Sequence, residues 1–199
     1  MRVWGGSLHR LGGVFIKFEK KEDFPEPPYI VCANHSSYLD IVLMYSIIPD
    51  YFIFMGKGEI KDWPLFNILF TKGMNILVER ASRTASHKAF KKAGEEIDLG
   101  SVVVIFPEGT IPYTAPQMKA FKNGAFKLAM EKNVPIVPIS FGNNWKLLQT
   151  GAVLKSNGRP GISKVYVHKA IYPKQNNDEE MVSLRKATFE AIDQSIHMK

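Results

Sequence analysis

The stretch "YIVCANHSSYLDIVLMYSI", residues 29–47, contains the junction on which the predicted fold depends. A short apolar run ends, four polar residues follow, and a longer apolar run begins within a turn. Such a change of pattern is typical of a buried strand that leads directly into a buried helix. We therefore predict a strand over residues 29–33 and a helix that begins at Ser36 or Ser37 and runs to about Ile48.

The same alternation of short apolar runs and helical patterns continues to the end of the chain. Further strands are predicted over residues 51–55, 73–79, 102–106, 134–141 and 165–170, and further helices over residues 61–70, 85–99, 121–132 and 178–197. This alternation predicts an α/β fold, here a single layered domain with a mostly parallel central sheet flanked by helices. Residues 1–24 are predicted to form an amphipathic N-terminal segment, and residues 25–199 the main domain.

Size and composition are those of one globular domain with a sizeable core. The chain has 199 residues, of which 45% are hydrophobic and 23% are charged. No apolar stretch reaches about 18 residues, so no membrane-spanning helix is predicted, and the N-terminus lacks the pattern of a signal peptide. The single cysteine, Cys32, lies in an apolar run and is expected to be a small core residue.

The balance of charge is basic. The net charge is +7 and the isoelectric point is about 9.4. A basic surface attracts acidic partners such as phospholipid headgroups, nucleic acid, a phosphorylated substrate or an acidic carrier protein. Composition does not choose among these partners.

His35 and Asp40 lie at the junction between the first predicted strand and helix. An imidazole can take a proton from an attacking hydroxyl, and a carboxylate that accepts the other ring N–H stabilises the cation formed. On a continuous helix this spacing would turn the two side chains roughly 140° apart. The pair can meet if His35 lies in the turn before the helix and Asp40 in its first turns.

A structural interpretation of the same residues stays open. Ser37 and Asp40 match a capping box, in which Asp40 closes the start of the helix and His35 is a polar turn residue.

Later stretches also place polar groups where predicted strands end. Glu108, Gly109 and Thr110 follow the strand in "VVVIFPEGT", and Arg80 follows the strand in "GMNILVERAS". Ligands bind beyond the carboxyl ends of parallel strands, and arginine suits phosphate. Taken singly, these residues also fit a helix-capping turn and a solvated charge, and Lys122 fits either an anion site or a solvated helix face.

In this order, the stretches resemble the motifs of the glycerolipid acyltransferases. Residues 34–40 match the N-H-x4-D signature, residues 57–80 look like a second block that ends in arginine, residues 106–110 match F-P-E-G-T, and residues 134–138 match V-P-I-V-P. The chain therefore resembles the bacterial 1-acylglycerol-3-phosphate acyltransferases over about residues 25–170.

The resemblance implies transfer of a fatty acyl group from a thioester to the free hydroxyl of a lysophospholipid, without a covalent enzyme intermediate. It implies that His35 is the general base and that Asp40 holds its ring, within an acyltransferase domain over residues 25–199. The residues expected to bind or support the substrate are Asn34, Lys57, Arg80, Glu108, Gly109, Thr110 and Lys122. No metal or other cofactor is expected, because a thioester is already activated and needs mainly positioning and proton removal.

One residue departs from the family pattern. Family members often carry Arg-Ser directly after F-P-E-G-T, whereas Ile111 follows here. Either another basic residue binds the phosphate, or the acceptor differs from lysophosphatidate. The candidate basic residues are Lys57, Arg80, Lys119 and Lys122.

The expected partners are a lysophospholipid acceptor, a donor in the form of acyl-CoA or acyl carrier protein, and an anionic membrane surface, with no nucleic acid. We expect a peripheral protein on the cytoplasmic face of the membrane. Residues 3–18 and 62–70 are candidate membrane contacts, and residues 62–70 fit a core helix equally well.

Two other classes of protein compete. A hydrolase would need a serine nucleophile, but no G-x-S-x-G elbow is present. A lipid-binding or nucleic-acid-binding module is compatible with the charge, but no nucleic-acid motif appears.

Overall fold

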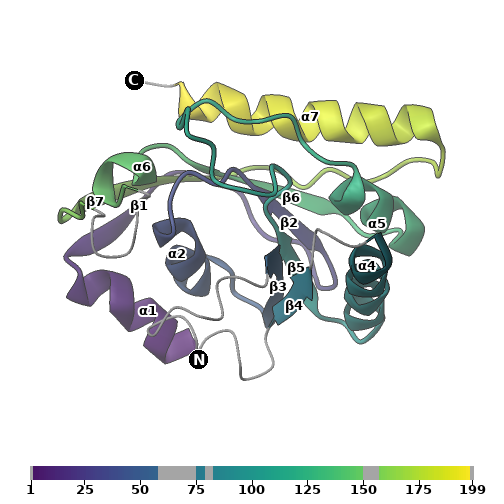
Figure 1. Cartoon of the computed structure of the whole chain (residues 1–199), viewed down its shortest axis with the longest axis horizontal. Helices are drawn as coiled ribbons and strands as arrows, with labels where there is room; N and C mark the ends of the chain where they lie inside the picture. The colour runs from purple at the N-terminus through teal and green to yellow at the C-terminus, as the bar shows by residue number, and fades with distance from the viewer. Residues whose placement is uncertain (1, 58–74, 79–82, 150–156, 198–199) are drawn as a thin grey trace.

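Seven strands form one central sheet, and helices cover both of its faces (Figure 1). The computed structural model describes residues 2–57, 75–78, 83–149 and 157–197. The elements in chain order are α1 (Arg2–Leu11), β1 (Val14–Lys21), β2 (Ile30–Ala33), α2 (Leu39–Ile47), β3 (Phe52–Lys57), β4 (Asn75–Val78), α4 (Arg83–Asp98), β5 (Val102–Ile105), α5 (Gly124–Lys132), β6 (Ile136–Phe141), α6 (Asn144–Leu147), β7 (Gly161–Val167) and α7 (Asp178–Ile196).

The directions of the strands decide which chain segments meet at each edge of the sheet. The strand order is β1-β7-β6-β2-β5-β3-β4. Strands β2 to β6 run parallel to one another, β7 is antiparallel to β6, and β1 is parallel to β7. The carboxyl ends of β2 to β6 therefore share one edge with the amino ends of β1 and β7. We call this edge the carboxyl edge.

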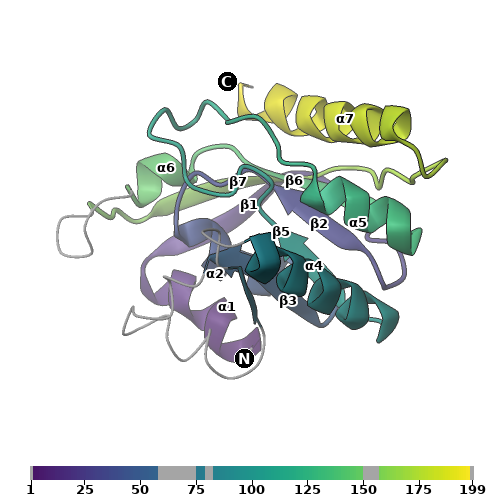
Figure 2. The same cartoon turned by 45° about the vertical axis from the view of Figure 1, so that its right-hand side comes forward.

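The core has two layers, one on each face of the sheet. Alternate residues of a strand point to opposite faces, so Val31 of β2 packs with α2 whereas Cys32 packs with α4, α5 and α7. Figure 2 shows α1 and α2 on one side of the sheet and α4, α5 and α7 on the other. Strands buried on both faces account for the continuous apolar runs in the sequence.

The predicted α/β fold with a mostly parallel sheet is confirmed. The structure adds elements that were not predicted, namely α6 and the separate α1 and β1 within residues 1–24. Among the described strands, β1 lies at the edge of the sheet and pairs with β7 alone. The charged residues in its carboxyl-terminal half are therefore exposed to solvent. The predicted helix over residues 61–70 lies outside the described residues.

The start of α2 lies later than predicted. The helix begins at Leu39 rather than at Ser36 or Ser37. The reason is that the backbone N–H groups of both serines donate to the Asp40 carboxylate, which keeps them in a turn. None of the described helices is both long enough and apolar enough to cross a bilayer.

His168 is a buried histidine that follows β7 and lies far from the predicted site residues in sequence. Its Nε2 lies 2.7 Å from the Ser140 hydroxyl, and the residue is 7% exposed. Burial, with a contribution from the positive charge of Lys20, lowers the pKa of His168 to about 4. The protein therefore favours the neutral ring.

We expect His168 to make the fold sensitive to acid. As the pH falls from 6.5 towards about 4, His168 becomes protonated in the unfolded chain but stays neutral in the folded protein. The free energy of unfolding should therefore decrease by about 1–3 kcal/mol over this interval because of His168. The free energy of unfolding of His168→Gln should decrease less than that of the wild type over the same interval, as measured by urea unfolding at a series of pH values. His87→Gln, at an exposed position, is the control. Equal pH slopes for wild type and His168→Gln would contradict the assignment.

Candidate active site

Asn34 fixes the position of the turn that carries the predicted site. It follows the last residue of β2, and its side chain bonds to both backbone groups of Phe141 at the end of β6. The amide Nδ2 donates to the Phe141 carbonyl at 3.1 Å, and the Phe141 N–H donates to Oδ1 at 2.8 Å. An amide carries its donor and its acceptor on two separate atoms of one planar group, so Asn34 bonds both backbone groups of Phe141 and ties the carboxyl ends of β2 and β6 together.

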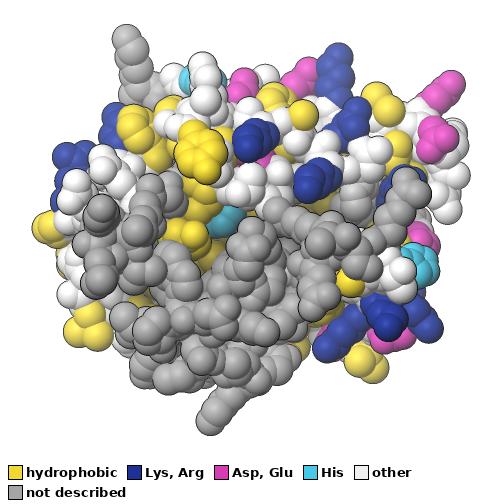
Figure 3. Space-filling model, viewed as in Figure 1, with side chains coloured by type: hydrophobic (Ala, Val, Ile, Leu, Met, Phe, Trp, Pro, Cys, Tyr) yellow, Lys and Arg dark blue, Asp and Glu magenta, His cyan; other side chains and the backbone are white. Residues whose placement is uncertain are grey.

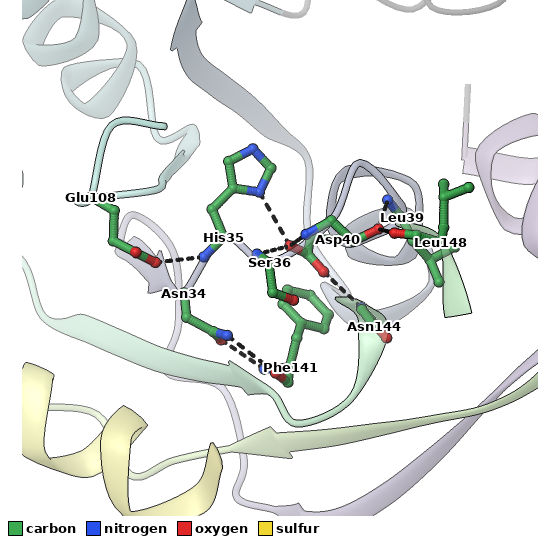
Figure 4. A network of polar contacts seen from close by, with 10 residues as sticks. Asn34, His35, Ser36, Leu39, Asp40, Glu108, Phe141, Asn144 and Leu148 are labelled. Carbon is green, nitrogen blue, oxygen red and sulfur yellow. Dashed lines mark hydrogen bonds and ion pairs between the residues drawn. The ribbon is translucent and has the colours of Figure 1, made fainter. Parts of the chain in front are cut away.

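The His35 and Asp40 side chains lie together, with Nδ1 of the ring 3.1 Å from Oδ2 of the carboxylate (Figure 4). Asp40 is fully buried, and His35 is 8% exposed. A carboxylate that receives other N–H donors acts as an acceptor, so Nδ1 carries the ring proton. Nε2 then has a free lone pair, and it makes no hydrogen bond to any residue that the structure describes.

The carboxylate of Asp40 also organises the start of α2. Its Oδ2 accepts the backbone N–H groups of Ser36 at 2.7 Å and Ser37 at 2.8 Å. The capping role and the pairing with His35 were alternatives in the sequence, and one carboxylate performs both. Backbone N–H groups compensate the buried negative charge.

Asn144 and Ser163 complete the surroundings of the carboxylate, and sequence reasoning missed both. Nδ2 of Asn144 donates to Oδ1 of Asp40 at 2.8 Å, and the Ser163 hydroxyl donates to Oδ1 of Asn144 at 2.6 Å. Both residues are fully buried. The serine fixes the orientation of the amide, so that its NH2 group faces the aspartate. A usable signal existed, since Asn144 closely follows the carboxyl end of a predicted strand.

Glu108 holds the turn from the other side. Its Oε1 accepts the backbone N–H of His35 at 2.8 Å, and its Oε2 accepts the backbone N–H of Lys119 at 2.9 Å. Glu108 is 3% exposed, and burial raises its pKa to about 7 although both N–H donors oppose the shift. Gly109 allows the sharp turn that follows, because its φ is +76°.

Phe106 supports the histidine ring. The two rings are stacked with centroids 4.1 Å apart and an angle of 16° between their planes. The Phe54 ring is in turn stacked with Phe106, with centroids 6.2 Å apart. The imidazole is therefore held by a carboxylate at Nδ1 and by an aromatic face, and neither contact involves Nε2.

Three further predicted residues, Thr110, Lys122 and Lys57, lie at the carboxyl ends of strands or in the segments that follow them. Thr110 and Lys122 are exposed in the segment after β5, and the Lys122 N–H donates to the Pro107 carbonyl. Lys57 is the last residue of β3. Arg80 lies outside the described residues, so its predicted contact with phosphate stays a prediction.

An apolar pocket of about 340 Å³ lies beside α2. Its walls come from α1, α2, α6 and residues 158–160, and they include Leu39 and Leu148. Leu39 adjoins Asp40 in the chain, and the Leu148 carbonyl accepts the Ser37 hydroxyl at 2.8 Å. The pocket thus lies against the start of the helix that carries Asp40, although neither His35 nor Asp40 lines it. Within the described part of the chain, no cluster of His, Cys, Asp or Glu could hold a metal ion.

The fold and site define an α/β protein with a histidine–aspartate pair at the carboxyl edge of its sheet. Residues 15–142 match the Acyltransferase family, and the chain belongs to that family. The matched region contains His35, Asp40 and Glu108, and it ends before Asn144 and Ser163.

The chain is similar to several curated proteins that are named as acyltransferases. A 1-acyl-sn-glycerol-3-phosphate acyltransferase of Chlamydomonas reinhardtii is 30% identical over 175 residues, which are 86% of this chain and 51% of that protein. A lyso-ornithine lipid O-acyltransferase of Rhizobium meliloti is 32% identical over 83 residues, 42% of this chain and 28% of that protein. The chain spans about half the length of the first curated relatives that it matches.

A solved structure shows the same fold. The crystal structure of the 1-acyl-sn-glycerophosphate acyltransferase PlsC from Thermotoga maritima matches with a TM-score of 0.79 and 24% sequence identity. The match covers 98% of this chain and 76% of that chain. It therefore includes α1, β1 and the reversed strand β7.

Ionisation of Glu108 is expected to weaken the fold as the pH rises. Its folded pKa lies above the ordinary value of 4.5, so its stabilising contribution is full below pH 4.5 and is lost as the pH passes about 7. Relative to Glu108→Gln, the wild type should lose about 1–3 kcal/mol of unfolding free energy over that interval. Denaturant unfolding from pH 4.5 to 7.5 measures this difference, with the exposed Glu131→Gln as control. A constant difference across the interval would show that Glu108 ionises normally.

Proposed function

We propose that this chain transfers a fatty acyl group from an acyl thioester to the free hydroxyl of a lysophospholipid. The favoured reaction converts 1-acylglycerol-3-phosphate to phosphatidate. One observation carries the proposal: Asp40 holds Nδ1 of His35, while Nε2 is free to accept a proton. Membership of the Acyltransferase family supports the same reaction class.

The reaction needs one proton acceptor and no covalent enzyme intermediate. Nε2 of His35 takes the proton of the acceptor hydroxyl as its oxygen attacks the thioester carbonyl carbon. The buried Asp40 carboxylate stabilises the imidazolium that forms. The C–S bond then breaks, and the departing thiolate takes the proton back from His35. Since a thioester is already activated, we propose that no metal takes part.

The identity of the lysolipid acceptor rests on fewer observations than the type of reaction. Arg80, Lys57 and Lys122 are our candidates for binding a phosphate. The residue after the F-P-E-G-T block is Ile111 rather than arginine, and one relative is named for a lyso-ornithine lipid. The alternative is therefore an acyltransferase that uses another lysolipid. A lipid-binding protein without catalysis is the less favoured alternative.

The donor is either acyl-CoA or acyl carrier protein, and we propose that the enzyme works as a peripheral protein on the cytoplasmic face of a membrane. The apolar pocket beside α2 is our candidate for holding a hydrocarbon chain near His35. Incubation of the purified protein with labelled acyl thioesters and a panel of lysolipids, followed by mass analysis of the products, tests both substrates. Absence of acylated product from every combination would reject the proposal.

His35→Ala and Asp40→Asn are expected to lower the rate of acyl transfer by at least about 100-fold, because each removes part of the proton acceptor. Both variants should remain folded, as judged by circular dichroism and cooperative unfolding. His87→Ala, at an exposed position of α4, should retain the wild-type rate. A folded His35→Ala variant that keeps the wild-type rate of acyl transfer would show that His35 is not the proton acceptor, and it would overturn the proposed mechanism.

Asn144→Ala is expected to lower kcat about tenfold with little change in KM, because it removes a charge-assisted hydrogen bond that orients Asp40. Its neighbour provides a matched control. Asn143 also makes two hydrogen bonds, to the Ile162 carbonyl and from the Lys164 N–H, but none to Asp40. Asn143→Ala should therefore destabilise the fold without lowering kcat. Equal losses of kcat in both variants would show that Asn144 has only a structural role.

A further inference from the structure

The reversed direction of β1 and β7 brings two distant chain segments to the edge of the sheet that carries His35. The last residues of α1, just before β1, are Arg10 and Leu11, and the segment before β7 contains Arg159 and Pro160. These segments meet, since the Gly161 N–H donates to the Gly13 carbonyl at 3.1 Å. We call this part of the carboxyl edge the β1–β7 end, formed by residues 10–17, 146 and 158–164.

The β1–β7 end is basic. Residues 2–18 and residues 141–177 contain no aspartate or glutamate. Its described basic residues are Arg10, Lys17, Lys146, Arg159 and Lys164. Glu19 pairs with Lys17 at 3.0 Å, and it lies further along β1, away from the carboxyl edge.

Exposed apolar side chains accompany these charges. Leu11 is 84% exposed, Phe15 is 58% exposed and Ile162 is 54% exposed. Phe15 and Ile162 are neighbours in the β1–β7 register, and Lys17 and Lys164 are the next pair on the same face. At the left-hand edge of the molecule in Figure 3, where Figure 1 places β1, β7 and α6, basic and hydrophobic side chains are visible, whereas acidic ones appear along the top and right.

The apolar pocket extends from this end towards the site. Gly12, Val14, Arg159 and Pro160 line it together with Leu39 of α2. One apolar cavity is therefore bounded both by the β1–β7 end and by the helix that carries Asp40.

We propose that the β1–β7 end docks on the surface of an anionic lipid bilayer, with Leu11, Phe15 and Ile162 in the interfacial region. Basic residues attract anionic headgroups, and aromatic and aliphatic side chains enter the boundary between headgroups and acyl chains. The proposal rests on the proposed function, because docking at this edge brings a lipid acceptor to the site. An acidic carrier protein would also be attracted by these charges, but it gives no reason for three solvent-exposed apolar side chains among them.

Vesicle binding tests the apolar part of the surface. The protein is floated with vesicles of phosphatidylcholine alone and of phosphatidylcholine with phosphatidylglycerol. Wild type should float with the anionic vesicles and much less with the neutral ones, and added salt should release it. Phe15→Ser combined with Ile162→Ser should weaken binding by about tenfold or more. Leu99→Ser, at a position that is 80% exposed on the opposite edge, should leave binding unchanged.

A second pair of variants tests the charges. Arg10→Gln combined with Lys146→Gln should weaken binding to anionic vesicles by about fivefold for each charge removed. Lys91→Gln combined with Lys186→Gln lowers the net charge equally at sites where both side chains are 74% exposed, and it is the matched control. Equal losses in the two double variants would mean that only net charge matters, and would overturn the proposed surface.

Activity measurements separate this proposal from the proposed function. The docking variants should lose acyl transfer to acceptor embedded in vesicles and retain transfer to acceptor in detergent micelles. Wild-type protein that acylates micellar acceptor but does not float with anionic vesicles would overturn the docking surface and leave the proposed function intact. Capture of acyl carrier protein that depends on Arg10 and Lys146, without vesicle flotation, would assign the surface to the donor and overturn the bilayer proposal.

Discussion

A carboxylate that water does not reach must be surrounded by donors, and Asp40 imposes this constraint on the site. Its donors are the His35 ring, the N–H groups of Ser36 and Ser37, and the amide of Asn144. These donors come from the turn after β2 and from the segment after β6. The ends of these two neighbouring strands must therefore hold a fixed position relative to each other. An uncompensated buried ion costs several kcal/mol. The contacts that stabilise the fold here are therefore the same contacts that fix the proton on Nδ1 of His35 and leave the lone pair on Nε2.

Local chemistry explains how much of this centre could be predicted. His35 and Asp40 lie five residues apart across one strand–helix junction, so the sequence alone contains both partners and the turn that joins them. The choice between a capping carboxylate and a partner for histidine could not be made, because both follow from the same local pattern. In the structure the two roles do not exclude each other, because Oδ2 of Asp40 accepts the N–H groups of Ser36 and Ser37 as well as that of the His35 ring. The parallel sheet was predictable for a similar reason, since strands buried on both faces are continuous apolar runs.

Long-range contacts account for what the sequence did not reveal. Asn144 reaches Asp40 across 104 residues, and Ser163 reaches Asn144 from β7. No periodicity connects such positions, and only the order of strands in the sheet brings them together. Glu108 illustrates the same limit in a predicted residue: its place at a strand end was predictable, but the path of the loop to Lys119 decides that its carboxylate meets two backbone N–H groups and becomes buried.

The reversal of direction between β6 and β7 has a consequence for a reaction on lipids. Such a reaction must bring a polar proton acceptor and a hydrocarbon chain to one place. Here the polar centre lies at the ends of β2 and β6, while the apolar pocket and the exposed Phe15 and Ile162 lie at the beginnings of β1 and β7. If β1 and β7 ran parallel to the other strands, their beginnings would lie at the opposite edge of the sheet. The length of a strand would then separate the apolar pocket from His35. The antiparallel pair removes that separation, so the two strands that depart from the parallel pattern bring the apolar pocket to the edge of the sheet that carries His35.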